Sequence, residues 1–433
     1  PDFRLGINMG AGDDRLILAT STGSGQLKNI SVDGGTGNNT FVTATSVGTS
    51  ANLEFKSFTN FQNYEIEGGS TDHDFTTLNG VTSVVVATNG GANNNLIDLA
   101  ANNGIVISGK NQTTGNNSNA NQTFGKIDVQ GADGATLAVK LDNTARIGGT
   151  GAGKLTVADL SVTDLPGNLS AVRTLNIESA GRRETTNEIT SIKAEKVGTF
   201  NFTGTQALTA GLDAAANTAG PAAGVSALVV DASALAAAFT LNVATDIVND
   251  VDANKTASFK AGASTKDALN FAAGVNTTAK TSVSGFETVS FKGGNFNAVN
   301  TTGVTLYKTD GAALTLTNLR GVENVELGSY DAATDTGSNF GGAQNFRTNA
   351  VSNDSALNLT AKFAAGAAQE INTKGFTTLN LKLDTLLAQT GGKNFNLNLE
   401  KVAVDGADAS VQVTSGVYAN AAAVPVTDFT KSN

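Results

Sequence analysis

The sequence predicts an all-β protein made of stacked short strands, in elongated β-roll, β-helix-like or irregular β-sandwich domains. Apolar and polar residues alternate in strings of about three to seven residues, for example at 175–177, 379–383 and 395–399, a period typical of half-buried strands. One turn–strand unit also recurs along the chain. Helical patterns are Ala-rich and are interrupted by Gly220-Pro221, so we expect helices of no more than a turn or two.

Glycine, threonine and asparagine dominate the composition, with 49, 56 and 47 residues of 433. Their combined share, roughly 35%, is far above ordinary globular usage. Gly and Asn tolerate the left-handed backbone of tight corners, and Thr suits the exposed face of a strand. A low-complexity coil is the alternative. A hydrophobic content of 40% and the regular alternation favour an ordered chain.

The scarce residue types exclude several kinds of chemistry. Without Cys there is no disulfide, no thiolate nucleophile and no cysteine metal site, and a single His excludes multi-histidine metal sites. The net charge of −10 opposes nucleic-acid binding, which needs basic patches. The apolar stretch 225–244 contains Asp231 and alternates at 240–243, so it predicts strand–turn–strand and no membrane span.

The recurring unit is a small or polar residue, an apolar residue, two variable residues and an alternating apolar pair. Its six copies occupy residues 60–66, 80–86, 171–177, 285–291, 321–327 and 375–381. Such a short strand cannot bury its apolar face alone, so we expect each copy to stack on the next. The spacing is irregular, which argues against a solenoid of fixed period.

Three domains are expected at this length. The chain changes character near residue 130, after the Asn-rich stretch 111–121, and again at 205–225, an Ala/Gly segment that holds Pro221. The resulting division is 1–130, 131–220 and 221–433.

Two acidic glycine turns near the start of the chain carry the most specific motif. Residues 10–18 read GAGDDRLIL, and residues 33–42 read DGGTGNNTFV. Both resemble the nonapeptide G-G-x-G-x-D-x-U-x of the repeats-in-toxin family, where U is apolar. The first has Met9 in place of the leading Gly, and the second has Asn39 where the Asp belongs. A third, degenerate copy at 262–270 keeps only Gly262, Asp267 and Leu269.

Glycine turns of this kind suit calcium, which takes six to eight hard oxygen ligands. In the family that the motif resembles, consecutive turns hold each ion between them. Here the first two copies are 25 residues apart and the third stands alone, so we expect isolated sites instead of a regular β-roll. The candidate ligands are Gly10, Gly12, Asp13, Asp14, Asp33, Gly35, Gly37, Asn39, Gly262 and Asp267. The alternative is that these segments are ordinary Gly/Asp hairpin turns.

Two further acidic clusters are weaker calcium candidates, with solvated loop charge as the alternative. They are Asp72 with Asp74, and Asp246 with Asp250 and Asp252. His73 lies between two Asp residues, but no Gly-x-Ser-x-Gly elbow accompanies it. We therefore expect no catalytic role for His73 and no enzyme activity for the chain.

The whole pattern resembles the repeats-in-toxin-type surface-layer proteins of Gram-negative bacteria, of the Caulobacter and Campylobacter kind. The shared features are the absence of Cys, the Ala/Thr/Asn/Gly richness, the acidic glycine turns and the units at 285–289 and 321–325. The resemblance implies an all-β cell-surface protein, secreted in one step (type I) without a cleaved N-terminal signal. It also implies subunits that crystallise in two dimensions with bound Ca²⁺. In that family an N-terminal part commonly anchors to lipopolysaccharide and a C-terminal segment directs secretion.

We therefore expect a structural surface-layer protein whose main partner is itself, with lipopolysaccharide or another surface glycan as an anchor. Copies of charge −10 repel one another, and divalent cations can cancel that repulsion. The first alternative is a calcium-dependent secreted adhesin or biofilm matrix protein. The second is a β-helix polysaccharide-degrading enzyme, which the absence of Trp and the presence of only four Tyr oppose.

Overall fold

The structure is a computed structural model. It describes residues 5–18, 30–44, 58–68, 71–76, 80–87, 91, 93–100, 103–108, 121–143, 153–165, 167, 169–182, 185–194, 196–213, 227–244, 256–272, 274–309, 312–331, 336–338, 342–348, 355–361, 369–376, 378–383, 395–399, 410–415 and 429–431. These residues form two compact units, one made of 1–239 with 262–264 and the other of 240–261 with 265–433. The three-domain division stays a prediction.

The predicted all-β class is confirmed, because nearly every described element is a strand. The one helical element among the described residues is a single 3₁₀ turn, η3 (Ala298–Asn300). Stretch 225–244 contains two strands joined by a short turn, as expected. In the part of the chain that the structure describes, no helix is long and apolar enough to cross a membrane.

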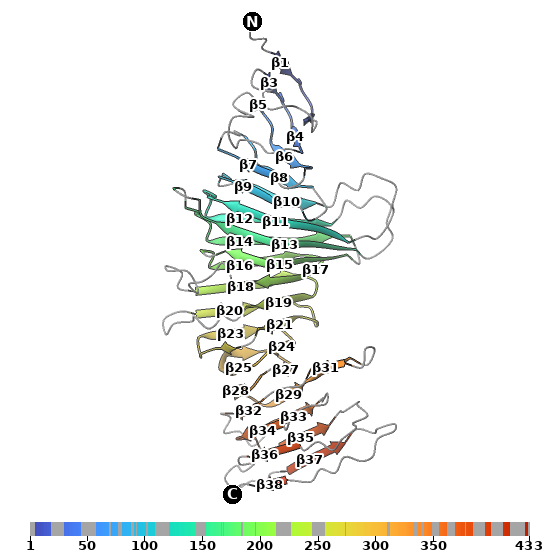
Figure 1. Ribbon diagram of the computed structural model, residues 1–433, viewed down its shortest axis with the longest axis vertical. Helices are drawn as coiled ribbons and strands as arrows, with labels where there is room; N and C mark the ends of the chain where they lie inside the picture. The colour runs from blue at the N-terminus through green and yellow to red at the C-terminus, as the bar shows by residue number, and fades with distance from the viewer. Residues whose placement is uncertain are drawn as a thin grey trace. The chain divides into compact units, whose positions relative to one another are not determined.

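Unit 1 is a stack of parallel strands in which the chain alternates between two sides (Figure 1). The even-numbered strands follow one another in one sheet: β2 (Arg15–Leu18), β4 (Thr40–Thr43), β6 (Asn63–Ile66), β8 (Ser83–Val86), β10 (Gly104–Ser108), β12 (Thr136–Asn143), β14 (Thr174–Gly181), β16 (Thr199–Gly204) and β18 (Ala227–Leu235). The odd-numbered strands form two more sheets: β1 (Leu5–Asn8), β3 (Ile30–Asp33) and β5 (Phe58–Thr59); then β7 (Thr71–Asp74), β9 (Asn94–Ile97), β11 (Gln122–Gln130), β13 (Lys154–Thr163), β15 (Thr186–Ala194) and β17 (Ala207–Leu212).

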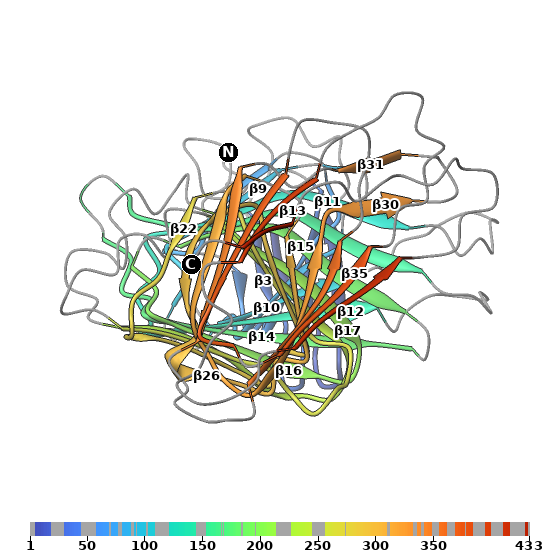
Figure 2. The ribbon, with the colours of Figure 1, turned by 90° about the horizontal axis from the view of Figure 1, so that it is seen from below.

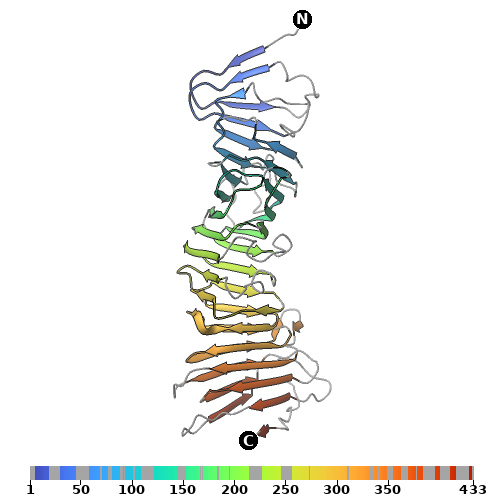
Figure 3. The same cartoon turned by 90° about the vertical axis from the view of Figure 1, so that its left-hand side faces the viewer.

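Unit 2 is also a stack of parallel strands, with three sides as far as β26 and two sides after it. Three parallel sheets supply all its described strands except those of one hairpin. The first sheet holds β20 (Thr256–Lys260), β23 (Thr281–Ser284) and β26 (Thr301–Thr302). The second holds β19 (Phe239–Val243), β21 (Ala268–Phe271), β24 (Thr288–Phe291), β27 (Leu306–Thr309), β29 (Val322–Leu327), β33 (Ala356–Ala361), β35 (Thr378–Leu383) and β37 (Ser410–Ser415). The third holds β22 (Val275–Asn276), β25 (Gly294–Asn297), β28 (Leu314–Leu319), β32 (Ala343–Thr348), β34 (Gln369–Lys374), β36 (Phe395–Leu399) and β38 (Phe429–Lys431). The later strands of the second and third sheets, orange to red, fall into two rows when viewed from below (Figure 2), and successive strands run side by side in Figure 3.

One hairpin departs from the parallel pattern. Strands β30 (Ser329–Asp331) and β31 (Thr336–Ser338) pair antiparallel, in a two-stranded sheet of their own.

We call each circuit of the chain, from one strand to the strand stacked on it in the same sheet, a coil.

The recurring turn–strand unit explains how the coils stack. In five of the six copies the first residue has a positive φ, as expected for a tight corner: Asn60, Gly80, Gly285, Gly321 and Gly375. The alternating apolar pair then lies on the strand and is buried in every copy, for example Val289 and Phe291 at 0–1% exposure. The unit is thus a corner followed by one core-facing strand.

Aromatic residues supply the largest fully buried side chains of the core. Phe41 stacks on Tyr64 with ring centroids 5.5 Å apart, and Tyr64 meets Phe75 edge-to-face at 5.2 Å. In unit 2, Phe271 stacks on Phe291 at 5.7 Å. Phe124, Phe202 and Phe346 are likewise fully buried, and Val, Leu, Ile and Ala supply most of the remaining core residues.

Candidate functional site

The two acidic glycine turns lie directly on top of each other. Strand β1 pairs with β3 so that Asn8 lies opposite Asp33, and the turns themselves are joined by a parallel bridge between Ala11 and Thr36. Each of these pairs is separated by the same 25 residues of sequence. The expectation that the two turns are isolated from each other is therefore wrong, because 25 residues complete one coil.

Backbone hydrogen bonds and glycines hold the two turns together. The N–H of Thr36 donates to the carbonyl of Gly10 at 3.0 Å, and the N–H of Gly12 donates back to the carbonyl of Thr36 at 2.9 Å. A Cβ on Gly35 would lie 1.7 Å from the Gly10 oxygen, and one on Gly37 would lie 2.0 Å from the Gly12 oxygen. Both glycines of the second turn also have positive φ, +74° and +133°. Only glycine permits turns this close.

Each turn opens on a polar side chain that accepts an N–H two residues later. Asn8 Oδ1 accepts from Gly10 at 2.9 Å, and Asp33 Oδ1 accepts from Gly35 at 2.8 Å. Asp33 Oδ1 also accepts from Asn60 Nδ2 at 2.7 Å. The hydrogen bond from Asn60, followed by that from Gly35, holds the pKa of Asp33 below its ordinary value. One oxygen of this candidate calcium ligand is thus engaged in supporting the turn.

Asn39, at the motif's Asp position, is fully buried and is part of the stacking. Its Oδ1 accepts the N–H of Asp14 at 2.9 Å, and its Nδ2 donates to the carbonyl of Asn60 at 3.0 Å. Its own N–H donates to Gln62 Oε1 at 2.8 Å. The amide therefore links three successive coils, a role that the sequence motif does not indicate.

The first turn carries the carboxylates that retain free coordinating capacity. Asp13 is exposed, and its Oδ1 accepts the N–H of Asn38 at 2.8 Å. Asp14 is half-buried, and its Oδ2 is one of the buried side-chain oxygens for which the described residues supply no hydrogen-bond partner. A buried, unsatisfied carboxylate oxygen is costly unless a proton donor or a cation meets it.

These residues fit calcium in chemistry. Glycine carbonyls and the carboxylates of Asp13 and Asp14 are hard oxygen donors of the kind that calcium takes, and the bare Oδ2 of Asp14 is a place for a cation. The described part of the chain contains no group of three or more His, Cys, Asp or Glu side chains arranged for a metal. A calcium ion at this turn would therefore take much of its coordination from the main chain and water.

The third, degenerate copy of the motif has a different structure. Gly262 does not have a positive φ, and a Cβ there would lie 2.4 Å from the Leu235 carbonyl oxygen. Asp267 is buried at 1% exposure just before β21, and its N–H donates to Glu287 Oε2 at 2.8 Å. The segment thus keeps the corner position of the motif without its glycine turn.

His73 faces the core, away from the two carboxylates beside it. It is fully buried, and its Nδ1 lies 2.8 Å from the hydroxyl of Tyr64. Burial lowers the pKa of His73 to about 3 and raises that of Tyr64 well above its ordinary value. The imidazole is therefore neutral and packs edge-to-face against the ring of Tyr64, with ring centroids 5.4 Å apart.

Asp72 and Asp74 lie on the opposite side of β7 and are half-buried. Asp72 Oδ1 accepts from Asn95 Nδ2 at 2.6 Å, and Asp74 Oδ1 accepts from both the N–H and the hydroxyl of Thr76, at 2.9 and 2.6 Å. Both have structural partners, and their role in calcium binding stays a prediction. The remaining candidates, Asp246, Asp250 and Asp252, lie outside the described residues.

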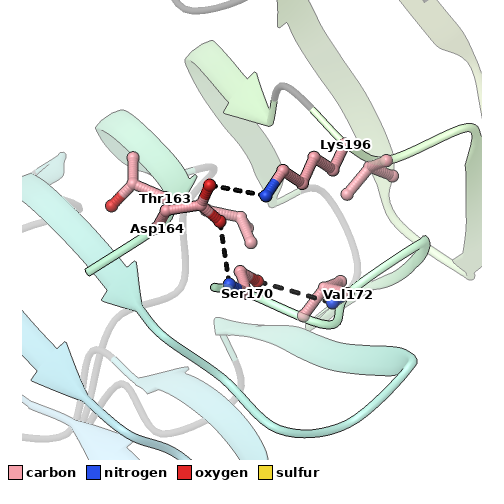
Figure 4. A pocket seen from close by; sticks show the side chains of 7 residues that line it. Thr163, Asp164, Ser170, Val172 and Lys196 are labelled. Atoms are coloured by element: carbon pink, nitrogen blue, oxygen red, sulfur yellow. Dashed lines mark hydrogen bonds and ion pairs between the residues drawn. The ribbon is translucent and has the colours of Figure 1, made fainter. Parts of the chain in front are cut away.

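A small pocket of about 250 Å³ is a feature that the sequence did not indicate (Figure 4). Asp164 lies in it, 2.5 Å from Lys196 Nζ and accepting the N–H of Ser170 at 2.8 Å. Burial alone would raise the pKa of Asp164, but hydrogen bonds from Lys196 and Ser170, and the charges of Lys196 and Arg173, bring it below its ordinary value. The ion pair between Asp164 and Lys196 lines this pocket, and no sequence motif contains both residues.

Comparisons with known proteins give no relative. No protein-family model matches the chain, and neither the curated proteins nor the solved structures contain a match.

Proposed function

We propose that this chain is a structural surface-layer protein that self-assembles into a calcium-stabilised two-dimensional lattice on the bacterial cell surface. The observation that carries the proposal is the pair of stacked glycine turns, with the unpartnered Oδ2 of Asp14 beside them. A rigid stack of parallel coils with few reactive side chains suits a building block. Secretion, and anchoring to lipopolysaccharide or another surface glycan, belong to the same proposal.

Calcium would act on the turn and on the charge of the molecule. Asp13 and Asp14 would hold the ion together with main-chain oxygens of the glycine turns. The bound calcium ion would coordinate the unpartnered Oδ2 of Asp14 and so stabilise the first coils. It would also reduce the repulsion between copies that each carry a net charge of −10.

A calcium titration of the purified chain, followed by light scattering and electron microscopy, tests the proposal. We expect periodic sheets with calcium, dispersal by a chelator and no sheets with magnesium at the same ionic strength. The double variant Asp13→Asn/Asp14→Asn should need at least tenfold more calcium. Asp133→Asn, which removes one exposed charge elsewhere in unit 1, should assemble as the parent does. Sheets that form equally well in chelator would contradict the proposal.

The adhesin alternative predicts a different result in the same experiment. A calcium-dependent adhesin would bind calcium and stay monomeric at concentrations at which a lattice protein forms sheets. Binding to isolated lipopolysaccharide or cell-wall glycan without self-assembly would then favour it.

A further inference from the structure

The pocket around Asp164 lies at a corner of unit 1 where the connection between two strands is unusually long. Strand β13 ends at Thr163 and β14 begins at Thr174, so the connection between them spans residues 164–173. The equivalent connections one coil before and one coil after are shorter, 131–135 and 195–198. Strand β13 lies between β11 and β15, and β14 lies between β12 and β16. The pocket therefore lies within the stack, with a described coil on each side of it.

Hydrogen bonds tie this long connection together. Asp164 Oδ1 accepts the N–H of Ser170 at 2.8 Å, which closes the loop on itself. One guanidinium nitrogen of Arg173 donates to the carbonyls of Ser170 and Val172, at 3.1 and 2.9 Å. These contacts position Asp164 and Ser170 before a ligand binds, which lowers the entropic cost of binding.

The pocket combines an apolar wall with a polar one. Val162, Val172 and Val197 line it and belong to the core, with exposed fractions of 5%, 1% and 3%. On the polar side, Lys196 and Ser170 both approach the carboxylate of Asp164 (Figure 4). An apolar surface beside a few convergent polar groups is typical of a small-molecule site.

The ion pair between Asp164 and Lys196 restricts the charge of a ligand. Asp164 Oδ2 lies 2.5 Å from Lys196 Nζ, and the pKa of Asp164 lies below its ordinary value, so the carboxylate is ionised at neutral pH. A free anion would have to compete with Asp164 for Lys196, and a free cation would have to compete with Lys196 for Asp164. A neutral ligand with polar groups leaves the ion pair intact.

The polar groups of the pocket retain hydrogen-bonding capacity. In the described part of the chain Lys196 Nζ makes its one contact with Asp164, which leaves its other N–H groups for a ligand. The hydroxyl of Ser170 accepts the N–H of Val172 at 3.4 Å and can still donate its own proton. Each oxygen of Asp164 accepts one of the hydrogen bonds given above and has a further lone pair. The pocket thus offers a charged acceptor flanked by two donors.

We propose that this pocket binds one neutral sugar ring, a monosaccharide unit of a glycan. Neighbouring hydroxyl groups of a sugar can donate to Asp164 and accept from Lys196 at the same time, while the C–H groups of the ring pack against the three valines. The volume of about 250 Å³ lies just below the roughly 300 Å³ at which drug-sized sites begin, so it suits one ring. The inference deepens the proposed glycan anchoring, on which its cellular role rests, by naming a site for it.

Saturation-transfer NMR with simple glycosides tests the proposal. The probes are the methyl glycosides of glucose, galactose, mannose, rhamnose and N-acetylglucosamine, at millimolar concentration. We expect at least one of them to bind the parent chain, equally well with calcium and with a chelator, because none of the candidate calcium ligands lines the pocket. Absence of binding by all five would overturn the proposal. Binding of acetate, tetramethylammonium or N-acetylalanine methylamide in place of the glycosides would also overturn it.

Two pocket variants and one matched control place the binding. Lys196→Met removes the charged donor and should weaken glycoside binding at least tenfold. Ser170→Ala keeps the N–H that Asp164 accepts and should weaken binding at least threefold. Lys193→Met is the control, because Lys193 Nζ also lies 2.5 Å from a carboxylate oxygen, that of Asp159, with an exposed fraction of 27% against 28% for Lys196. It lies outside the pocket and should bind as the parent does.

Thermal unfolding shows whether each variant is folded, and Ser170→Ala carries the test if Lys196→Met is not. Unchanged binding in the folded pocket variants, or an equal loss in Lys193→Met, would overturn the proposal.

The sugar site and the lattice fail in different ways. Glycoside binding by a parent chain that forms no sheets with calcium would support the sugar site and contradict the lattice. Calcium-dependent sheets without any glycoside binding would overturn the sugar site and leave the lattice standing. A chain that shows neither would overturn both.

Discussion

Asn39 Oδ1 accepts the backbone N–H of Asp14 at 2.9 Å, across 25 residues of sequence and inside the protein. The same amide donates to the carbonyl of Asn60. Asn39→Ala would leave the part-buried N–H of Asp14 and the part-buried carbonyl of Asn60 without these partners, each loss costing about 1–3 kcal/mol. We expect the free energy of opening of the first two coils to fall by about 2–4 kcal/mol, measured by native-state hydrogen exchange at the amides of β2 and β4.

The neighbouring Asn38→Ala is the control for that loss. Asn38 is exposed, and its side chain accepts one hydrogen bond, from Asn63 Nδ2 at 2.9 Å. Its removal should change the same protection by less than about 1 kcal/mol. Equal losses of protection in the two variants would show that the hydrogen bonds of Asn39 to Asp14 and Asn60 do not stabilise the first two coils.

The stacking of the turns gives a second prediction, which compares Gly35→Ala with Gly10→Ala. Both positions have positive φ, so both substitutions carry backbone strain of about 1–2 kcal/mol. Only Gly35→Ala also forces a Cβ against the Gly10 oxygen, at 1.7 Å. We expect Gly35→Ala to unpair β1 from β3, seen as lost amide protection in both strands, while Gly10→Ala leaves that pairing in place. Similar protection in the two variants would contradict the close stacking.

The alternation of apolar residues was enough to predict the strands and the corners. Units such as 285–291 show both features in sequence: a residue that tolerates positive φ, and apolar residues spaced by two. The stacking of the two acidic turns was missed, because sequence distance suggested separation. Spacing says nothing of how many residues complete a coil, and here the intervening 25 return the chain to the same corner.

The single histidine makes the stability of unit 1 depend on pH. Burial lowers the pKa of His73 to about 3, so the folded state holds it neutral, while the unfolded chain protonates near 6.5. Stability is therefore lost as the pH falls from about 6.5 to 3, by about 1.4 kcal/mol per pH unit. We expect urea unfolding of the parent to weaken by about 3 kcal/mol from this group between pH 7 and pH 4.

The variant His73→Phe isolates the histidine, because every carboxylate is retained. It should be about 1–2 kcal/mol less stable at pH 7, where Tyr64 loses its partner at Nδ1. Its stability should then fall less steeply toward pH 4 than that of the parent. Parallel pH curves for the two proteins would contradict a buried neutral His73.

The surroundings of the candidate ligands could not be predicted from residue type alone. Asp33 directly precedes a calcium-type motif and Asn39 stands at its Asp position, yet the side chains of both residues hold turns and coils together. The sequence shows that His73 lies between two Asp residues on one strand. Only the contact with Tyr64 shows that the side of the strand that carries His73 faces the core. A carboxylate or amide at a corner suits a backbone N–H as well as a cation, and tertiary contacts decide between them.

Glu323 makes the stability of unit 2 depend on pH in the opposite direction. Burial raises its pKa to about 6, and the hydrogen bond from the N–H of Arg320 only partly opposes this. The folded state thus retains the proton that the unfolded chain loses near 4.5, so stability is lost as the pH rises from about 4.5 to 6. Allowing for solvent screening at this half-buried position, we expect a loss of about 1–2 kcal/mol.

The variant Glu323→Gln should remove this pH-dependent loss, so that it is more stable than the parent at pH 7 but not at pH 4. Glu326→Gln on the same strand should give no such gain, since Glu326 lies 3.7 Å from Lys308 Nζ. Urea unfolding of the three proteins at both pH values decides the matter, and a Glu323→Gln variant that is weaker at pH 7 would show that the carboxylate is stabilising.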